Sequence, residues 1–232
     1  IITVSDFELG NIKKKLQLPD SQLKMIYNGY NEWFRPIESD KRQYKKYIAD
    51  AGYFFFLGNT DPKKNTERTL VAYAKYLEQS EVKRPLLMAD LDQEYLNGII
   101  ERNGIEAIRD HIVMPGYIVN SDLPYIYNNA FAFLYTSLRE SFGIPLLEAM
   151  ACGTPVITSN TSSMPEIAGH DAILINPESS DEIALKMLQL ERDTDFYQRQ
   201  MAVGLERAKL FSWRKTTENL LRLYEEVYKE IK

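Results

Sequence analysis

Short apolar runs alternate with longer amphipathic segments through the middle of this chain. The apolar runs predict strands at residues 53–57, 86–89, 112–114, 131–135, 155–158 and 173–175. Apolar positions at helical spacing predict helices at residues 67–77, 93–102, 122–128, 144–151 and 181–190. Strands that alternate with helices are typical of parallel sheets, so we expect an α/β fold with a parallel sheet of about six strands.

The two ends of the chain follow different patterns. Residues 2–4, 6–15 and 24–27 predict a small unit of strand, helix and strand, and two long helical patterns follow residue 191. Ser212 is the expected N-cap of the second pattern. Apolar side chains recur along that pattern at helical spacing and predict a stripe that packs on a core. The stripe consists of Trp213, Leu220, Tyr224, Val227 and Ile231.

Composition limits the class of protein. The chain has 232 residues, 44% of them hydrophobic, which is enough to bury the core of one large α/β unit. The net charge of −5 argues against nucleic acid as the main partner, because a broad phosphate-binding surface is basic. The single cysteine, Cys152, fits a reducing compartment, and we expect the cytoplasm. No apolar run approaches the roughly 20 residues of a membrane-spanning helix. Because Ile1 is not methionine and already begins a predicted strand, we expect a segment of a longer protein.

The segment 139–158 reads as a loop, a short helix and a strand, and it carries the clearest candidate chemistry. Pro145 suits the first turn of a helix and Gly153 suits a left-handed stop after its last turn, so the helix has about two turns. At the start of this helix, Gly143 lets a ligand approach the backbone closely. The free N–H groups and the helix dipole attract an anion there, and phosphate is the natural guest.

Two glutamates frame this helix. Glu148 is expected on its first turn, where its carboxylate can accept hydrogen bonds from the hydroxyls of a sugar placed beside the phosphate. Glu140 lies on the loop ahead of the helix and is expected to face the reacting group. The pair predicts one carboxylate that holds the ligand and one that takes part in the chemistry.

A second loop is expected to face the same ligand. Residues 58–65 follow the first strand of the predicted sheet and bring the ammonium groups of Lys63 and Lys64. Taken alone, a lysine pair on a turn is usually solvated, and the segment matches neither common glycine-rich phosphate-binding motif. Ligands of such sheets bind beyond the carboxyl ends of the strands, so residues 58–65, 115–118 and 138–143 are expected to face one crevice.

Other candidate sites have simpler interpretations. Asp90 and Asp92 resemble a metal-binding Asp-x-Asp triplet, but their place before a predicted helix favours capping. His111 and His170 have no partner at metal-ligand spacing. Residues 41–47 interleave basic and aromatic residues and could contact lipid or nucleic acid. A helix with its lysines outward and its aromatic residues inward explains the same string, and we favour it.

Several of these segments match a known set of motifs. The E-x7-E element matches Glu140 to Glu148 within the longer run 140–156, and S-S-x-P-E matches residues 162–166. Residues 58–65, Gly116-Tyr117 and 211–213 are similar to further loops of the same set. The chain therefore resembles the retaining glycosyltransferases of family 4, which have the two-domain GT-B fold, and specifically their C-terminal domain that binds the nucleotide-sugar donor.

The resemblance implies three divisions of the chain. Residues 1–37 correspond to the tail of the N-terminal acceptor domain and the linker, and residues 38–210 to a Rossmann-like donor-binding domain. Residues 211–232 correspond to a C-terminal helix that packs back across the domain.

The resemblance also implies roles for individual residues. Glu140 becomes the catalytic residue near the reacting carbon of the sugar, Glu148 holds the ribose hydroxyls, and Lys64 contacts the diphosphate. The backbone of residues 142–144 meets the phosphates and the sugar, and residues 116–118 border the base. The other expected donor-binding residues are Gly58, Asn59, Lys63, Gly116, Tyr117, Ile118, Ser141, Phe142, Gly143 and Ile144. Asn59 stands where many relatives have arginine, and Ser141 replaces the usual glycine.

The implied function is the donor-binding domain of a metal-independent glycosyltransferase of hexosyltransferase type, with no cofactor. Its substrate is a nucleoside-diphosphate sugar, and its acceptor is a glycan or a lipid-linked glycan bound by an N-terminal domain that this sequence lacks. We expect the fragment alone to transfer little, and the full enzyme to lie in the cytoplasm or at the inner membrane face. Two alternatives stay open: a nucleotide-sugar epimerase of similar architecture and a non-catalytic nucleotide-sugar-binding module.

Overall fold

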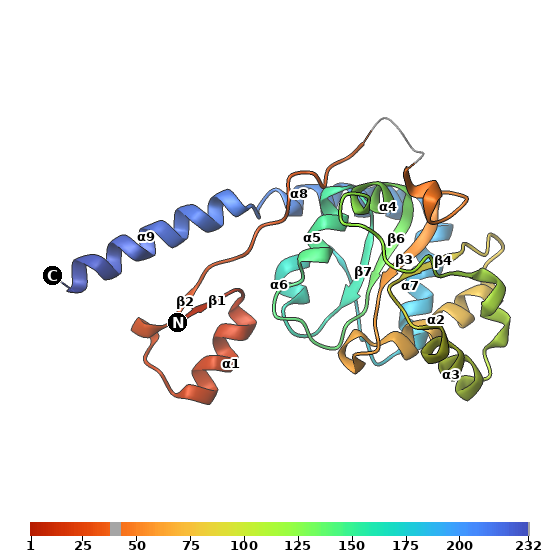
Figure 1. The fold of residues 1–232 in the computed structure, drawn as a ribbon, viewed down its shortest axis with the longest axis horizontal. Coiled ribbons are helices and arrows are strands. Elements are labelled where there is room, and N and C mark those ends of the chain that lie inside the picture. The colour runs from red at the N-terminus through yellow and green to blue at the C-terminus, as the bar shows by residue number, and fades with distance from the viewer. Residues whose placement is uncertain (38–42, 232) are drawn as a thin grey trace.

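The computed structural model describes residues 1–37 and 43–231. A parallel sheet of six strands forms the centre of this described part, with the spatial order β5-β4-β3-β6-β7-β8. Figure 1 labels β3, β4, β6 and β7 of this sheet. The strands are β3 (Tyr53–Leu57), β4 (Leu86–Ala89), β5 (Ile112–Val113), β6 (Ala130–Tyr135), β7 (Val156–Ser159) and β8 (Ile173–Ile175). Each strand end lies within one residue of its expected place, so the predicted α/β fold is confirmed.

Helices cover both faces of this sheet. One face packs against α2 (Thr66–Gln79), α3 (Gln93–Asn103) and α7 (Ser180–Arg192). The other face packs against α4 (Leu123–Asn129), α5 (Ile144–Ala151) and α6 (Met164–Ala168), and α8 (Thr194–Ala208) lies against α5. Successive strand residues point to opposite faces, so Phe54 and Phe56 join one core while Phe55 joins the other. Strands buried on both faces explain the continuous apolar runs of the sequence.

Several short elements were not expected from the pattern. They are α6 and the 3-10 helices η1 (Asp20–Gln22), η2 (Gln43–Lys46), η3 (Pro62–Lys64) and η4 (Glu106–His111). In the basic stretch, Lys41 and Arg42 lie outside the described residues, and η2 takes the place of the expected helix. Tyr44 is buried as expected, whereas Tyr47 is half-buried and its hydroxyl donates to Asp122.

The N-terminal residues form a small unit beside the main sheet (Figure 1). In it, β1 (Ile2–Thr3) and β2 (Lys24–Met25) pair in parallel and α1 (Asp6–Leu16) connects them. The last helix, α9 (Trp213–Ile231), leaves the main sheet and runs along this unit (Figure 1). Thr216 Oγ1 donates to the Tyr27 carbonyl at 2.7 Å, and Lys24 lies 3.8 Å from Glu226.

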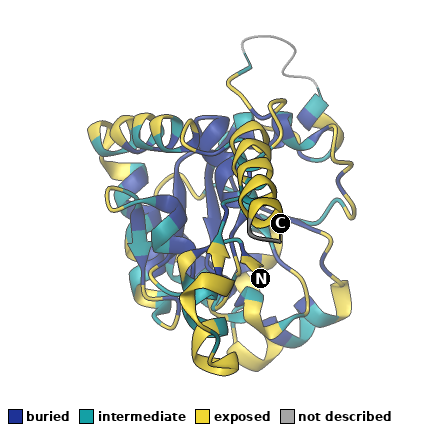
Figure 2. Ribbon diagram, turned by 90° about the vertical axis from the view of Figure 1, so that its left-hand side faces the viewer, coloured by how far each residue is buried: buried dark blue, intermediate teal, exposed yellow. Residues whose placement is uncertain are grey.

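The expected packing of the apolar stripe of α9 differs from what the structure shows. Trp213, Tyr224 and Val227 are 47%, 57% and 43% exposed, and the helix is mostly exposed in Figure 2. The side chain of Ile231 lies outside the described set. The helix begins where Ser212 accepts a hydrogen bond from the Lys215 amide, as expected, but there it points away from the sheet. It therefore does not pack across the donor domain, and the boundaries of the three divisions stay predictions. Over the described ranges, no helix combines the length and apolar character needed to cross a membrane.

Asn65 ties together the two loops that leave the central strands β3 and β6. Its side-chain amide donates to the carbonyls of Thr136 and Pro177 at 3.0 and 2.7 Å, and the residue is buried with φ at 61°. Asparagine tolerates this left-handed conformation better than most residues, and its two bonds satisfy carbonyls that are otherwise buried without a donor.

We expect Asn65→Gly to lower the free energy of unfolding by about 2 kcal/mol, because both amide bonds are lost while glycine keeps the backbone conformation. Asn65→Ala should cost about 1 kcal/mol more, because alanine is strained at positive φ. Urea unfolding of both variants checks this, with the exposed Asn120 of the loop after β5 replaced by alanine as a control. A glycine variant as stable as the wild type contradicts the proposed role of the amide.

Candidate functional site

The sheet order makes the carboxyl ends of β3 and β6 the expected place of the ligand crevice. From β3 the chain continues to β4 on one side, whereas β6 continues to β7 on the other, so the loops that follow these two strands diverge. Parallel sheets bind ligands at such a point, beyond the carboxyl ends of the strands. The two loops are linked here because the Leu138 amide donates to the Lys63 carbonyl at 2.7 Å. The residues expected to face one crevice, on loops 58–65 and 138–143, are thus brought together.

The loop before α5 has the backbone geometry that the sequence predicted. Gly143 is the N-cap of α5 with φ at 104°, Pro145 lies in the first turn, and Gly153 follows the helix with φ at 77°. Hydroxyls of the S-S-x-P-E segment hold the loop in place. Ser163 Oγ donates to the carbonyls of Glu140 and Phe142 at 2.9 and 3.1 Å, and Ser162 Oγ accepts from the Glu140 amide at 3.1 Å. The start of α5 therefore has a fixed position at the crevice.

Lys64 and Glu140 form an ion pair across the crevice. The Lys64 ammonium lies 2.6 Å from Glu140 Oε1, and the two side chains are only 19% and 15% exposed. The same ammonium lies 5.6 Å from the centre of the Tyr135 ring. Burial, and then the charge of Glu140 and a hydrogen bond to it, raise the pKa of Tyr135 well above its ordinary value. Tyr135 was not predicted as a site residue, although it ends β6 and so lies at the carboxyl edge of the sheet.

Glu148 lies deeper than expected. It is the fifth residue of α5 and begins the second turn, because the helix starts at Ile144, so its expected place on the first turn is wrong. Burial raises its pKa from 4.5 to about 7, and a hydrogen bond from the Tyr127 hydroxyl, 3.4 Å away, opposes this rise only in part. Tyr127 was also missed, since nothing in its local pattern separates it from the other core aromatics. Ionisation of a carboxyl group at this depth is unfavourable, and hydroxyl groups that donate hydrogen bonds to it stabilise the ionised form.

The loop after β3 contributes a backbone and one inward-pointing ammonium. A Cβ on Gly58 would lie 2.0 Å from the Phe56 ring, so only glycine fits this close turn. Asn59 bonds within the loop, where its side chain accepts from the Asp61 amide at 2.9 Å. The Lys63 ammonium lies 3.1 Å from Asp61 and is half exposed. Of the two adjacent lysines, Lys64 is therefore the one that points to Glu140.

The loop after β5 offers less than the sequence suggested. The Gly116 carbonyl accepts from the Asp90 amide at 3.1 Å, which joins this loop to the end of β4. Tyr117 is 64% exposed, whereas Ile118 is 4% exposed and belongs to the core. The Ile118 side chain therefore cannot border a ligand, and only Tyr117 and the backbone stay open. Asp92 caps α3, because its carboxylate accepts from the Tyr95 amide at 2.8 Å.

The remaining predicted residues lie on the loop before α5. Phe142 is buried against Tyr27 and Phe211, so it can offer its backbone but not its ring to a ligand. Ser141 is exposed, and its hydroxyl contacts Glu8 at 3.2 Å. Ile144 is half-buried in the first turn of α5.

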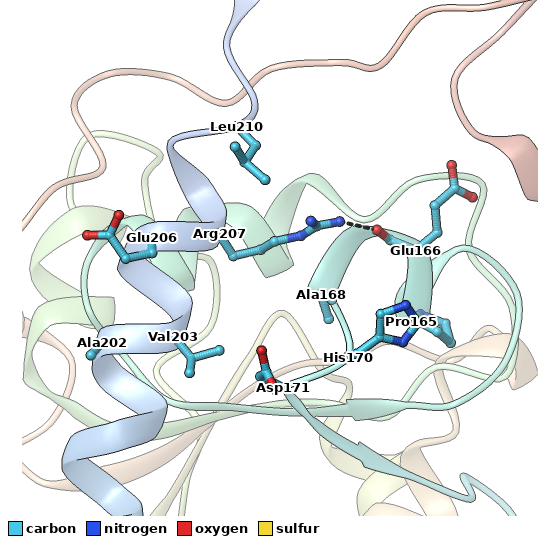
Figure 3. Close-up of a pocket in the computed structure, with 11 residues that line it drawn as sticks. Pro165, Glu166, Ala168, His170, Asp171, Ala202, Val203, Glu206, Arg207 and Leu210 are labelled. Carbon is cyan, nitrogen blue, oxygen red and sulfur yellow. Dashed lines mark hydrogen bonds between the residues drawn. The ribbon is translucent and has the colours of Figure 1, made fainter.

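A second concavity, of about 810 Å³, lies between α6 and α8 (Figure 3). Apolar side chains such as Pro165, Val203 and Leu210 line it, with Arg207 at its wall. The lining described for it includes no residue of the predicted donor site. Within the described ranges, no three histidine, cysteine or carboxylate side chains gather as a metal site would need.

Comparison with known proteins agrees with this geometry. The model of the family "Glycosyl transferases group 1" matches residues 38–204. The chain is 32% identical over 230 residues to O-antigen chain mannosyltransferase B of Escherichia coli. The matched region covers 97% of this chain and 60% of that relative. It therefore spans only part of the length of this curated relative.

Solved structures show the same fold. Sucrose-phosphate synthase from Thermosynechococcus elongatus superposes with a TM-score of 0.83 at 23% identity, over 99% of this chain and 58% of that one. HepE of Anabaena, in complex with UDP and glucose, superposes with a TM-score of 0.82 at 19% identity, over 97% and 62% of the two chains. The α/β fold, the loops that meet at the switch point and the match over residues 38–204 agree: this chain belongs to the glycosyl transferases group 1 family.

Proposed function

We propose that this chain is the donor-binding part of a retaining glycosyltransferase of family 4 that uses no bound metal. The enzyme moves a hexose from a nucleoside-diphosphate sugar to a glycan or a lipid-linked acceptor. The observation that carries the proposal is the Lys64–Glu140 pair at 2.6 Å, held at the switch point just ahead of the N-terminus of α5. This places one cation and one carboxylate close to the positive end of the α5 dipole.

In this proposal, binding of the donor exchanges the partners of Lys64. A diphosphate in the crevice takes the Lys64 ammonium from Glu140, and the positive end of the α5 dipole stabilises the remaining negative charge. Glu140 is then free to face the reacting carbon of the sugar. Glu148 accepts hydrogen bonds from the ribose hydroxyls, and the exposed Tyr117 borders the base. Preorganised positive groups thus do the work that a divalent metal does in other transferases.

The relatives narrow the proposed substrates. One carries the name O-antigen chain mannosyltransferase B and another the name serotype-specific mannosyltransferase WbdA, both from Escherichia coli. We therefore propose a mannose-type hexose and a growing surface polysaccharide as donor sugar and acceptor. The acceptor is bound by the preceding half of the polypeptide, in the cytoplasm or at the inner face of the membrane.

Titration of this chain with GDP, UDP and ADP by calorimetry tests the site. We expect one of the three to bind, and Lys64→Ala to weaken that binding about 10- to 100-fold, because a charge-assisted contact to the diphosphate is lost. The control is Lys75→Ala, which removes a lysine of α2 that pairs with Asp181 and should leave the affinity unchanged. If none of the three nucleotides binds, the proposed site is wrong.

Glu148→Gln should stabilise the free protein at high pH. The carboxyl has a pKa of about 7 when folded and about 4.5 when unfolded, so the folded protein holds the extra proton between these values. The neutral Glu148 carboxyl makes its full contribution to the free energy of unfolding below pH 4.5, and this contribution is lost as the pH rises through 7. At pH 8, the variant should gain up to roughly 3 kcal/mol in free energy of unfolding, and at pH 4 almost nothing. Chemical unfolding measures this, with exposed Glu178→Gln as the matched control.

The same group should make nucleotide binding pH-dependent. Ribose hydroxyls bind the ionised carboxylate, so binding releases a proton and the wild-type affinity should fall roughly tenfold from pH 8 to pH 6. In Glu148→Gln the affinity should be lower at pH 8 and vary little over this range. Equal pH profiles for the variant and the wild type contradict the proposed role of Glu148.

Reaction class is tested with the full-length protein and labelled nucleotide sugars, with and without acceptor. We expect transfer only when acceptor is present, no loss of activity with a chelator, and a product whose anomeric configuration by NMR equals that of the donor. Product formed without acceptor favours the epimerase, and binding without turnover favours the non-catalytic module. A strict metal requirement rules out the metal-independent mechanism.

A further inference from the structure

The N-terminal helix α1 contacts the loop that carries Glu140. Ser5 Oγ donates to the Ser141 carbonyl at 2.7 Å, and Ser141 Oγ lies 3.2 Å from Glu8 Oε1. Arg139 also reaches Glu8 Oε1, at 3.2 Å. More than 130 residues separate the partners along the chain in each contact. The first and middle parts of the chain therefore meet at the residues on either side of Glu140.

Two features mark these contacts as more than incidental surface contacts. Ser5 is fully buried, and its hydroxyl both donates to Ser141 and accepts from the Glu8 amide as the N-cap of α1. The Glu8 side chain is only 15% exposed, although no described residue of α1 counts as buried. The Arg139 side chain is 56% exposed, so its ion pair contributes less than the two serine contacts.

A separate anchor fixes α1 on the donor domain. The Glu166 carboxylate accepts from the amides of Asp6 and Phe7 at 2.7 and 3.2 Å, where the helix dipole favours a negative charge. Figure 3 shows this carboxylate pointing away from the cavity between α6 and α8, while Arg207 donates to the Glu166 carbonyl. The guanidinium also donates to the Ile167 carbonyl at 2.8 Å, which holds α6 in place. The start of α1 therefore has a second point of attachment, on α6, besides its contacts with the Glu140 loop.

We propose that Glu8 and Ser5 are positioning residues that set the direction of Glu140 and couple the N-terminal unit to the donor site. Within the donor domain, Ser162 and Ser163 hold the amide and carbonyl of Glu140 and the carbonyl of Phe142. The carbonyl and hydroxyl of Ser141, between these two residues, are held from α1. Docking of α1 therefore completes the conformation of the loop. The proposal rests on the proposed function, since Glu140 is the carboxylate that faces the sugar.

Amide hydrogen exchange of the free chain tests the coupling without any ligand. The Glu140 amide, bonded to Ser162 Oγ, should exchange about fivefold faster in Glu8→Ala and in Ser141→Ala, because both variants lose the contact between Ser141 and Glu8. The double variant should exchange no faster than either single variant, since the exposed Arg139 pair that Glu8→Ala also removes contributes little. Glu8→Gln keeps an acceptor for the Ser141 hydroxyl and should exchange more slowly than Glu8→Ala. Asp20→Asn, which removes an exposed ion pair with Lys13 of α1, is the control and should change nothing at the loop.

Affinity for the nucleotide provides a second readout. For whichever of GDP, UDP and ADP binds, Glu8→Ala should lower the affinity for its hexose conjugate about fivefold and leave the affinity for the bare nucleotide nearly unchanged. The reason is that Glu140 faces the sugar, whereas Lys64 faces the diphosphate. Unchanged exchange of the Glu140 amide in Glu8→Ala overturns the proposal, as does faster exchange spread evenly over the central strands. If no nucleotide binds the wild type, the proposed function fails, whereas the exchange experiment still decides the coupling.

Discussion

The ion pair between Lys64 and Glu140 joins the two loops on which the candidate site is built. Both side chains are largely removed from water, and each charge is tolerated because the other is 2.6 Å away. Loss of either partner leaves a charge in a poorly hydrated crevice, which favours any ligand that supplies the missing charge. A diphosphate can do so for Lys64. The hydrogen bonds of Asn65 and Leu138 join the same loops independently of the ion pair.

Glu148 shows a conflict between stability and binding within the same short helix. Burial makes its ionised form unfavourable in the free protein, and the only hydrogen bond that the described contacts give its carboxylate, from Tyr127, is long at 3.4 Å. A carboxyl group that served packing alone would be better replaced by an amide. Its cost becomes useful when two adjacent hydroxyls of a ligand donate to it, because hydrogen bonds to a charge are strong in a dry site. Such local conflicts are typical of functional sites.

The sequence predicts those parts of the molecule that depend on short-range physics. Apolar runs such as Tyr53–Leu57 have few alternatives once they are buried on both faces, and Gly143 and Gly153 mark the ends of α5 through their backbone conformation alone. Because parallel strands end at one edge of the sheet, the loops that carry Lys64 and Glu140 are expected at the same edge. Contacts made across the fold have no such local signal. Tyr135 beside Glu140, Ile118 in the core and the exposed stripe of α9 depend on where distant segments pack.

The Glu140 loop brings these two kinds of constraint together. Gly143, with its positive φ, gives the loop its turn into α5 but provides little rigidity of its own. The hydroxyls of residues 162 and 163 restrain the loop at Glu140 and Phe142. The start of α1 restrains Ser141, which lies between these two residues. In the proposed mechanism Glu140 releases Lys64 and then faces a sugar, which needs a backbone that stays still while the side chain changes partner. Contacts from two parts of the chain to three consecutive residues provide that fixed backbone.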